Sequence, residues 1–330
     1  MTAKRFAVLG CGSIGRRHLR NLRELGQEDL MAFDPAPTAR EAVAGEFGIK
    51  CFSLLDDVWA ERPDTVLVTA PSSMHVELAI VGARNGCHLF IEKPLSHTLD
   101  GVGDLLETVK RQTLITMVGC NMRFHPGPAL VKRLIDEGVV GNVLAARVKT
   151  GSYLPEWRPG MDYRDSYSAS VRMGGGALLD CIHEIDLALW YLGPGRVAGS
   201  AIRRADSLGL EVDGLAELLV QHDRGALTSI HVNFVQRDYK RCCQVIGEKG
   251  TIYWDFAAPA VEVHTSQTTA RRYDLDPNWN VDQMYLDEMS YFIDCVEKCK
   301  QTFCSVEDGK AALQIVLSAK ELGSRIDSKT

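Results

Sequence analysis

Residues 5–15 read RFAVLGCGSIG, and this stretch decides how the first third of the chain folds. The apolar run that ends at Leu9 predicts a buried strand, and the glycines that follow predict a tight turn into a helix. Gly10, Gly12 and Gly15 match the pattern G-x-G-x-x-G. In this pattern the first glycine permits the turn, the second lets a ligand approach the backbone, and the third allows close packing of helix on strand.

The context of these glycines points to a dinucleotide. A strand is predicted over residues 30–33 and ends at Asp34, where a carboxylate is typical of hydrogen bonds to the hydroxyls of an adenosine ribose. A carboxylate there would also repel a 2′-phosphate, so we expect NAD, with NADP the less favoured cofactor. Arg40 could offset that repulsion if its side chain folds back toward Asp34. We expect instead an exposed charge on the helix predicted over residues 37–47.

Alternating strands and helices continue to about residue 120. Strands are predicted over 65–68, 88–91 and 116–120, and helices over 75–85 and 99–111. Strands that alternate with helices of this length form βαβ units. We therefore expect an α/β Rossmann domain, with a mostly parallel, doubly wound sheet, over residues 1–123.

Residues 124–330 have a different pattern. A polar and aromatic stretch, 151–173, leads into a helix predicted over residues 174–192. Short alternating strands are predicted over 142–149, 216–220, 227–234, 241–246, 251–256 and 261–264, and helices over 128–137, 284–300 and 310–326. We expect an α+β domain with a large open, mainly antiparallel sheet, and terminal helices that could pack back on the first domain.

Composition excludes several classes of partner. The net charge of −6 gives no reason to expect nucleic acid or an anionic membrane. No apolar run approaches the roughly 20 residues of a membrane span, and the N-terminus shows no signal peptide. The ten cysteines are scattered, and Cys295 and Cys299 lack a second pair at zinc-like spacing. We expect a cytoplasmic protein with reduced thiols and no metal.

Cofactor contacts are expected at the start of the first helix and where the predicted parallel strands end, because ligands of such sheets bind at that edge. The expected contacts are Gly10, Gly12, Ser13, Ile14, Gly15, Asp34, Thr69, Ala70, Pro71, His75, Glu92, Lys93 and Asn121.

The tripeptide Glu92-Lys93-Pro94 follows the buried strand predicted over residues 88–91. Burying an ammonium group is costly unless something offsets it, and Pro94 biases Lys93 toward an extended backbone. The chain therefore aims one lysine at the edge where the cofactor is expected, while Glu92 anchors locally.

A second constellation lies on the helix predicted over residues 174–192, which begins GGGALLDCIHEID. Asp180 and His183 are three residues apart and share a face of such a helix, as do His183 and Asp186. A lone histidine on an apolar helix is usually a satisfied core residue. Three glycines and two acids at helical spacing favour a site instead.

Taken in order, the glycine pattern, the strand-end Glu-Lys-Pro and the helix with Asp180 and His183 resemble the Gfo/Idh/MocA family, the glucose–fructose oxidoreductase and inositol dehydrogenase group. The resemblance covers essentially the whole chain. It implies NAD(P)-dependent oxidation or reduction of a secondary alcohol of a sugar, nucleotide sugar or cyclitol. It implies a Rossmann domain joined to a sheet-rich domain that supplies the substrate site and an oligomer interface, here of a homodimer or homotetramer. It makes Lys93, His183 and Asp180 the expected catalytic residues.

One spacing departs from that family. Many members place the aspartate and the histidine four residues apart, whereas Asp180 and His183 are three apart. We therefore weight His183 above Asp180. In the oxidative direction a base must take the hydroxyl proton while a hydride goes to nicotinamide C4. That base could be His183, with Lys93 stabilising the alkoxide, or Lys93 itself, and the sequence leaves the choice open.

The polar stretch before the glycines carries arginines and aromatic residues. Arginine binds carboxylate or phosphate bidentately, so we expect an anionic substrate such as a nucleotide sugar, although an ordinary solvated loop fits equally well. The expected substrate contacts are Arg123, Tyr153, Trp157, Arg158, Arg164, Tyr167 and His183. Tyr239, Tyr285 and Glu288 are further candidates that the sequence does not rank.

Two other functions fit the same pattern. An enzyme could hold NAD tightly and use it transiently, by oxidation with elimination or epimerisation and then re-reduction. The fold could also serve as a catalytically silent NAD-sensing regulator. Retention of Lys93 and His183 argues against the sensor, which needs neither side chain.

Overall fold

A computed structural model describes residues 4–266 and 268–327 of the chain. These residues divide into two compact units. The first unit runs as far as Asn121 and also takes in Asp282–Lys310. The second comprises Met122–Val281 and the residues from Ala311 onward.

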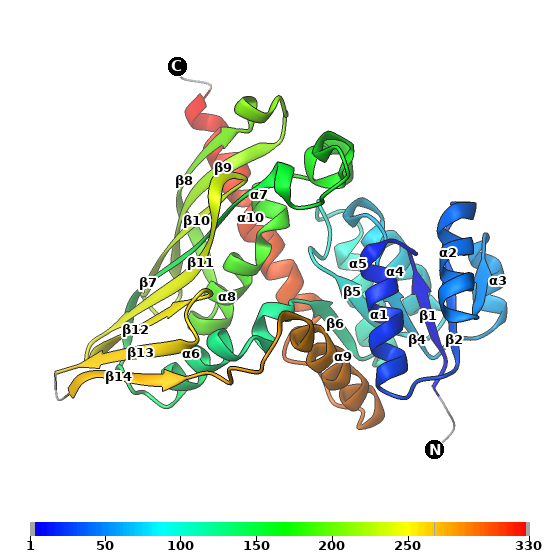
Figure 1. Ribbon diagram of the computed structural model, residues 1–330, viewed down its shortest axis with the longest axis horizontal. Coiled ribbons are helices and arrows are strands. Elements are labelled where there is room, and N and C mark those ends of the chain that lie inside the picture. The colour runs from blue at the N-terminus through cyan, green and yellow to red at the C-terminus, as the bar shows by residue number, and fades with distance from the viewer. Residues whose placement is uncertain (1–3, 267, 328–330) are drawn as a thin grey trace. The chain divides into compact units, whose positions relative to one another are not determined.

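The first unit is built on a six-stranded sheet, in the order β3-β2-β1-β4-β5-β6 (Figure 1). The strands are β1 (Phe6–Leu9), β2 (Leu30–Phe33), β3 (Lys50–Phe52), β4 (Thr65–Val68), β5 (His88–Glu92) and β6 (Thr116–Gly119). Every neighbouring pair runs parallel. This is the strand order of a Rossmann sheet, in which the direction of winding reverses beside β1. The expected parallel, doubly wound fold is confirmed.

Helices pack against this sheet, and β1, β2, β4 and β6 are therefore buried at every residue. The helices are α1 (Ser13–Glu24), α2 (Pro37–Phe47), α3 (Leu55–Ala60), α4 (His75–Arg84), α5 (Val102–Gln112) and α9 (Val281–Glu297). Although α9 lies far along the chain, its Phe292 packs edge-to-face on Phe90 of β5, with ring centroids 5.5 Å apart. Residues 282–310 thus complete the core of the first unit.

The second unit contains an eight-stranded sheet in the order β14-β13-β12-β11-β7-β10-β9-β8. The strands are β7 (Val143–Tyr153), β8 (Gly195–Arg204), β9 (Asp213–His222), β10 (Leu227–Asn233), β11 (Val235–Gly247), β12 (Gly250–Asp255), β13 (Ala260–Thr265) and β14 (Thr268–Asp274). Only β10 and β7 run parallel among the described pairs, and the other pairs are antiparallel. The expected large, mainly antiparallel sheet is confirmed.

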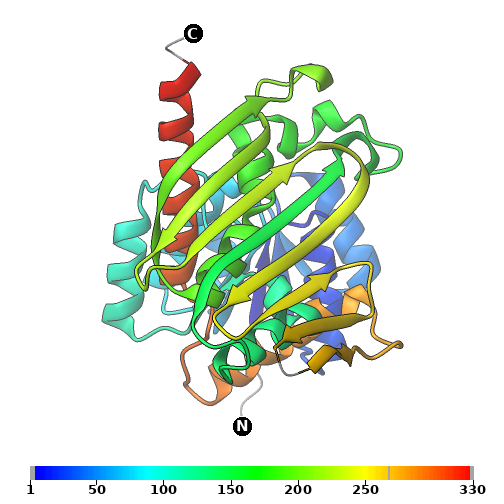
Figure 2. The ribbon, with the colours of Figure 1, turned by 90° about the vertical axis from the view of Figure 1, so that its left-hand side faces the viewer.

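Helices cover one face of this sheet. They are α6 (Pro126–Asp136), α7 (Ala177–Asp180), α8 (Ile182–Leu192) and the second-unit part of α10 (Val306–Asp327). Leu178, Ile185 and Leu313 from these helices share one buried cluster with Leu218 and Ile230 of the strands. Figure 2 views the sheet from the opposite face, with the green and red helices behind it.

One local prediction was wrong, and several elements were missed. The helix expected over residues 174–192 is two helices, because Cys181 leaves the helical conformation (φ −95°, ψ 30°) between α7 and α8. The short elements β3 and α3 were missed because three and six residues carry too little pattern to detect. The strand β8 was also missed. Within the described residues, none of the helices is both long and apolar enough to cross a bilayer.

Candidate active site

The glycine loop leaves backbone donors open to a ligand. Gly12 is the N-cap of α1, and no side chain caps that helix. A Cβ atom on Gly12 would have nothing within 4 Å. On Gly10 (φ +112°) it would lie 2.7 Å from the Ala70 nitrogen, and on Gly15 it would collide with the Gly10 carbonyl. Gly10 and Gly15 are thus required by packing, whereas Gly12 keeps space in front of the helix N-terminus, as a bound pyrophosphate needs. The predicted contacts Ser13 and Ile14 are the first residues of the same helix.

Asp34 follows β2 and is engaged with the same loop. Its Oδ2 accepts the backbone N–H of Cys11 at 2.8 Å, and its Oδ1 accepts that of Ala36 at 2.8 Å. Burial, followed by the charge of Asp34, raises the pKa of the Cys11 thiol to about 12. Asp34 therefore stands beside the glycine loop, where the adenosine ribose of a dinucleotide binds.

The expectation that Arg40 is an exposed helix charge was wrong, because its side chain is only partly exposed. Its side chain folds back, and Nη1 donates to the carbonyl of Asp34 at 2.7 Å and to that of Pro35 at 2.9 Å. The two adjacent carbonyls follow β2 directly, and together they hold the guanidinium through Nη1. The guanidinium is thereby fixed next to Asp34.

The residues that follow β4 connect the end of this strand to the glycine loop and to α4. Thr69 is buried and donates from its hydroxyl to the Gly10 carbonyl at 2.8 Å. Ala70 receives His75 Nε2 at 2.7 Å on its carbonyl, and Pro71 caps the short turn that leads into α4. Thr69 and His75 thus tie the β4 edge to its neighbours.

His75 is almost wholly buried, and both of its ring nitrogens face backbone carbonyls. Nε2 meets Ala70 as above, and Nδ1 lies 2.8 Å from the carbonyl of Pro94. Desolvation lowers the pKa of His75, against the effect of the two carbonyls. His75 thus holds the segment after Lys93, and its direct contact with the cofactor stays a prediction.

Glu92 and His18 form a buried pair at the end of β5. Nε2 of His18 lies 2.7 Å from Oε1 of Glu92, and the other carboxylate oxygen accepts the N–H of Lys93 at 3.1 Å. Desolvation raises the pKa of Glu92, but the hydrogen bond and charge of His18 and the charges of Lys93 and His75 together outweigh it, and the pKa is lowered. Glu92 therefore anchors the strand end locally, and the backbone of Lys93 is fixed from both sides, at Glu92 and at Pro94.

A tyrosine from α9 joins this cluster. The guanidinium of Arg17 lies 4.4 Å from the ring centroid of Tyr285 and forms an ion pair with Asp282. Burial, then the charge of Glu92, raises the pKa of Tyr285, while Lys93, Arg17 and a hydrogen bond with Asn121 lower it. Tyr285, which the sequence left unranked, therefore lies in the electrostatic environment of Glu92 and Lys93.

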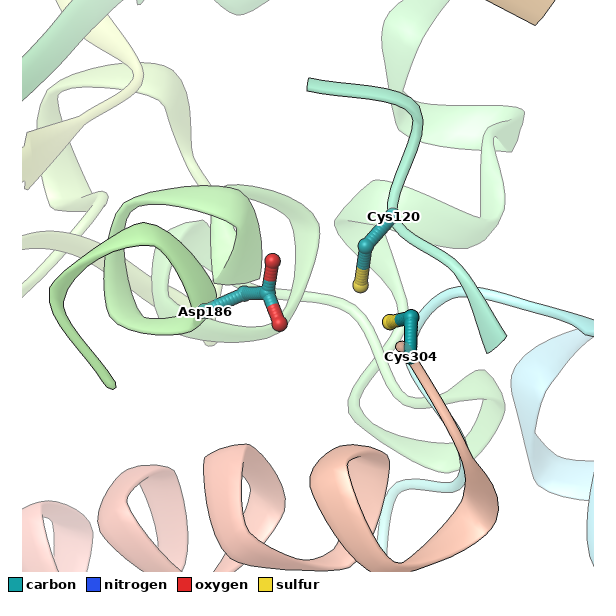
Figure 3. Close-up of side chains that lie close together, drawn as sticks. All are labelled: Cys120, Asp186 and Cys304. Atoms are coloured by element: carbon teal, nitrogen blue, oxygen red, sulfur yellow. The ribbon is translucent and has the colours of Figure 1, made fainter. Parts of the chain in front are cut away.

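Asn121, the last predicted cofactor contact, follows β6 and is buried. The residue before it, Cys120, points its sulfur toward that of Cys304 (Figure 3), and the two sulfurs lie within 4.8 Å of each other. Cys304 also accepts the N–H of Val118 on its carbonyl. The chain around Cys304 thereby supports the strand end that carries Asn121.

In the second unit, His183 occupies the second position of α8, and Asp180 is the last residue of α7. Both are buried. The break at Cys181 means that the two do not lie on one continuous helix, so the shared helical face inferred from their spacing was wrong. Asp186 does lie on α8 with His183.

Two buried ion pairs fix α8. Asp186 receives Arg123 Nε at 2.9 Å and Nη2 at 2.6 Å, and both side chains are only 2% exposed. Glu184 lies two residues before Asp186 on α8, and its Oε1 accepts a hydrogen bond from Arg241 Nε at 2.7 Å. Glu184 raises the pKa of Arg241 against the effect of desolvation. Arg123 thus has a partner on α8, and its contact with substrate stays a prediction.

Two of the three glycines before α7, Gly175 and Gly176, are explained by close packing within the second unit. A Cβ on Gly175 would collide with the carbonyls of Tyr167 and Ser168, and on Gly176 (φ +119°) with the carboxylate of Asp213. That carboxylate also accepts the N–H that opens α7, from Leu178 at 2.8 Å. Gly175 and Gly176 therefore allow the chain to pack closely on itself before α7.

The predicted substrate residues before these glycines each have a side-chain partner, and Arg158 and Tyr167 are partners of each other. Trp157 donates from Nε1 to Ser152 Oγ at 2.8 Å and packs on the core. In the remaining pairs an arginine guanidinium lies over a tyrosine ring. The distances from the guanidinium carbon to the ring centroid are 5.0 Å for Arg158 and Tyr167, 5.3 Å for Arg164 and Tyr163, and 3.8 Å for Arg237 and Tyr153. Arg164 is exposed. The structure therefore gives this stretch an ordered arrangement, and its role with substrate stays a prediction.

A groove of about 490 Å³ lies on the face of the eight-stranded sheet that is turned away from α7 and α8. Arg147, Lys149, His231, Gln244 and Tyr253 contribute to its lining. None of the predicted site residues lines it. It is a feature separate from the candidate active site.

The sequence reasoning missed the partners that hold the predicted residues. His18 lies three residues after Gly15, on the buried face of α1. A polar residue on that face was the available sign that His18 has a buried partner. Arg241 lies 57 residues from Glu184, and no local pattern links them.

Comparisons with known proteins agree with this architecture. Residues 4–120 match the model described as an oxidoreductase family with an NAD-binding Rossmann fold, and residues 129–253 match the GFO/IDH/MocA C-terminal domain. The chain is 29% identical to myo-inositol 2-dehydrogenase of Thermotoga maritima, over 96% of this chain and 95% of that protein. It is 28% identical to scyllo-inositol 2-dehydrogenase (NAD(+)) of Bacillus subtilis, over 96% and 92%. Levoglucosan dehydrogenase, solved in complex with NADH and levoglucosan, shares the fold with a TM-score of 0.88 at 19% identity, over 98% and 97% of the two chains.

Proposed function

Because this chain belongs to the Gfo/Idh/MocA family of oxidoreductases, we propose that it is an NAD-dependent dehydrogenase that acts on a secondary alcohol of a cyclitol, sugar or nucleotide sugar. The relatives named above act on inositols, and the solved levoglucosan dehydrogenase binds an anhydrosugar. A cyclitol or a neutral sugar is therefore the first substrate class to test.

The observation that carries the proposal is the construction of the strand end at Lys93. Its backbone is held at Glu92, which His18 fixes, and at Pro94, whose carbonyl faces His75. This strand end lies at the carboxyl edge of a parallel sheet, the edge at which Rossmann domains bind dinucleotides. A lysine whose backbone is fixed at that edge suits a chemical role better than a structural one.

We assign the dinucleotide to the α1 side of the same edge. The uncapped N-terminus of α1 offers N–H groups and partial positive charge to the pyrophosphate. Asp34 accepts hydrogen bonds from the adenosine ribose, which favours NAD. When bound, the nicotinamide supplies the hydride acceptor.

The remaining chemistry is the movement of one proton. In oxidation the alcohol oxygen must lose its proton as the hydride leaves carbon. We propose that Lys93 donates a hydrogen bond to that oxygen and stabilises its developing charge, and that His183 takes the proton with help from Asp180. Lys93 acting alone as the base remains the alternative, and the pH profile of a His183→Gln variant separates the two.

The arginine and tyrosine pairs of the second unit support an anionic substrate as the second class to test. Arg158 is only partly exposed and stacks on Tyr167, an arrangement that leaves N–H donors at its edge. A nucleotide sugar or an acidic sugar is the corresponding substrate class. Arg158→Ala should then raise KM for an anionic substrate and leave KM for a neutral one unchanged.

The test is a panel of cyclitols, neutral sugars, acidic sugars and nucleotide sugars with NAD, read by the absorbance of the reduced nicotinamide. A dehydrogenase gives stoichiometric reduced cofactor. An enzyme that uses NAD transiently converts substrate with no net reduction, which product analysis detects. A regulator binds NAD and leaves every substrate unchanged.

We also propose that the chain forms a homodimer or homotetramer through the second unit. Support comes from Leu219, Leu227 and Tyr253, which are exposed on the face of the sheet turned away from α7 and α8. Exposed large apolar side chains on one face are typical of an interface. Leu219→Glu should reduce the mass of the assembly in light scattering, whereas an unchanged mass would contradict this surface.

A further inference from the structure

We propose that Arg40 makes the nucleotide site of the first unit tolerant of a 2′-phosphate, so that the protein binds NADP as well as NAD. The inference rests on the proposed function, because it concerns the cofactor of the same site. It departs from the preference that Asp34 alone predicts.

The guanidinium of Arg40 is held at the end of β2. Arg40 comes from α2, and its Nη1 donates to the carbonyls of Asp34 at 2.7 Å and Pro35 at 2.9 Å. These carbonyls follow β2, where a Rossmann site holds the adenosine ribose. The two hydrogen bonds hold the charge at that place without ordering by a ligand, and so reduce the conformational entropy lost when a phosphate binds.

Arg40 has donors beyond those that hold it in place. A guanidinium has five N–H donors, of which two belong to Nη1. Nε and Nη2 make no hydrogen bond among the described residues 4–266 and 268–327. Together these two nitrogens form the planar edge that matches a phosphate bidentately. Arg40 therefore presents an unused phosphate-binding edge while its other nitrogen anchors it.

The carboxylate of Asp34 is already hydrogen-bonded to the backbone. Both carboxylate oxygens already accept backbone N–H groups, from Cys11 and Ala36, each at 2.8 Å. These bonds offset part of the negative charge that would repel a 2′-phosphate. Each oxygen retains a lone pair for a ribose hydroxyl, so NAD keeps its contacts. The carboxylate thus favours NAD less strongly than its identity suggests.

A second guanidinium acts on the same loop. Arg16, on the first turn of α1, and Arg40 both lower the pKa of the Cys11 thiol by their charge, against burial and Asp34. Arg16 is only loosely paired, at 3.9 Å from Glu46. Two positive groups therefore contribute to the electrostatic potential at the loop that holds Asp34, and positive potential favours a phosphate.

The test is direct binding of NAD and of NADP to the purified full chain by isothermal titration calorimetry, so that the readout does not depend on turnover. We expect wild-type affinities within about tenfold of each other. Arg40→Ala should weaken NADP binding by about tenfold or more and NAD binding by less than about twofold, the range of one charge-assisted bidentate contact. Arg20→Ala removes an exposed guanidinium of α1 that pairs with Glu46 and should change neither affinity.

The outcomes separate the inference from the function on which it rests. NAD binding without NADP binding in the wild-type protein overturns the inference and leaves the proposed dehydrogenase standing. An equal loss of both dinucleotides in Arg40→Ala, or no change in either, also overturns it, because the side chain then has no selective contact with the 2′-phosphate. Failure of the wild-type protein to bind either dinucleotide contradicts the proposed function itself.

Discussion

Nε2 of His18 lies 2.7 Å from Oε1 of Glu92, and both side chains are buried. This pair ties α1, which opens at the glycine loop, to the strand end that carries Lys93. Helix and strand are 74 residues apart in the chain, so the pair is one of the long-range contacts that define the edge of the first sheet.

Removing His18 should therefore destabilise the protein. His18→Ala leaves the buried carboxylate of Glu92 without its partner, and the free energy of unfolding at neutral pH should fall by about 3–5 kcal/mol. The measurement is urea denaturation followed by circular dichroism. His264→Ala is the matched control, because His264 is exposed and lies 3.9 Å from Glu262, and it should change stability by less than about 1 kcal/mol.

The pH dependence of that difference has a definite sign. The folded pKa of Glu92 is lowered, so its ionised form stabilises the fold above the unfolded pKa of about 4.3. This contribution is lost as the pH falls through the folded pKa. The gap between wild type and His18→Ala should close below about pH 4. A gap that stays constant into acid would show that the carboxylate is not involved.

The pair of Arg123 and Asp186 gives a second stability prediction, in the other unit. Both side chains are 2% exposed, so Asp186→Ala leaves a buried guanidinium uncompensated and should lower the free energy of unfolding by about 3–5 kcal/mol. Asp136→Ala breaks an exposed pair with Lys132 and should cost less than about 1 kcal/mol. Similar urea midpoints for the two variants would contradict the importance of the buried pair.

His125 predicts a loss of stability in mild acid. Its Nδ1 accepts the N–H of Gly127 at 3.0 Å, as the N-cap of α6, and its ring packs on Trp254, Phe256 and Trp279. Burial, with the charge of Arg241, lowers its pKa to about 4.

Because the unfolded pKa is about 6.5, the unfolded state binds more protons between these values, and stability falls as the pH drops from 6.5 to 4. The loss should reach about 3 kcal/mol. His125→Asn keeps a capping oxygen and removes the titration, so its stability should vary less over that range. An unchanged pH dependence would rule out His125 as the cause.

The glycine loop predicts a variant that folds and fails to bind. A Cβ on Gly12 meets nothing within 4 Å, and Gly12 has φ −67° and ψ −171°, which alanine tolerates. Gly12→Ala should therefore keep the wild-type melting temperature and weaken NAD binding by about tenfold or more, because the methyl group occupies the approach to the helix N-terminus.

Gly45→Ala is the control for that substitution. Gly45 lies in α2 and also has open space around it, so the variant should bind NAD normally and gain about 0.5–1 kcal/mol of stability. Normal NAD affinity in Gly12→Ala would place the pyrophosphate elsewhere.

The sequence predicted those parts of the fold that repeat a pattern. Buried runs such as residues 65–68 announce parallel strands, and the glycine loop locates the nucleotide edge. The break at Cys181 escaped prediction because neither proline nor glycine marks it. The contacts of His18 with Glu92 and of Arg241 with Glu184 join distant segments, and no local preference encodes them. Sequence therefore identified candidate reactive groups, while the side chains that hold them became visible only in three dimensions.

Arg40 illustrates the same limit at one residue. The sequence offered two conformations for it and favoured exposure, since charged residues on helices are usually solvated. The choice depended on the carbonyls of Asp34 and Pro35 after β2, whose position relative to the Arg40 side chain only the folded chain reveals.

The central claim is that Lys93 acts on the reacting alcohol oxygen, beyond any contact that it makes with the cofactor. The most direct measurement is NAD affinity alongside turnover in Lys93→Met, with Lys110→Met, an exposed lysine of α5, as control. We predict that Lys93→Met binds NAD with nearly wild-type affinity and loses turnover by about 10²-fold or more, while Lys110→Met retains both. Wild-type turnover in Lys93→Met would contradict the account.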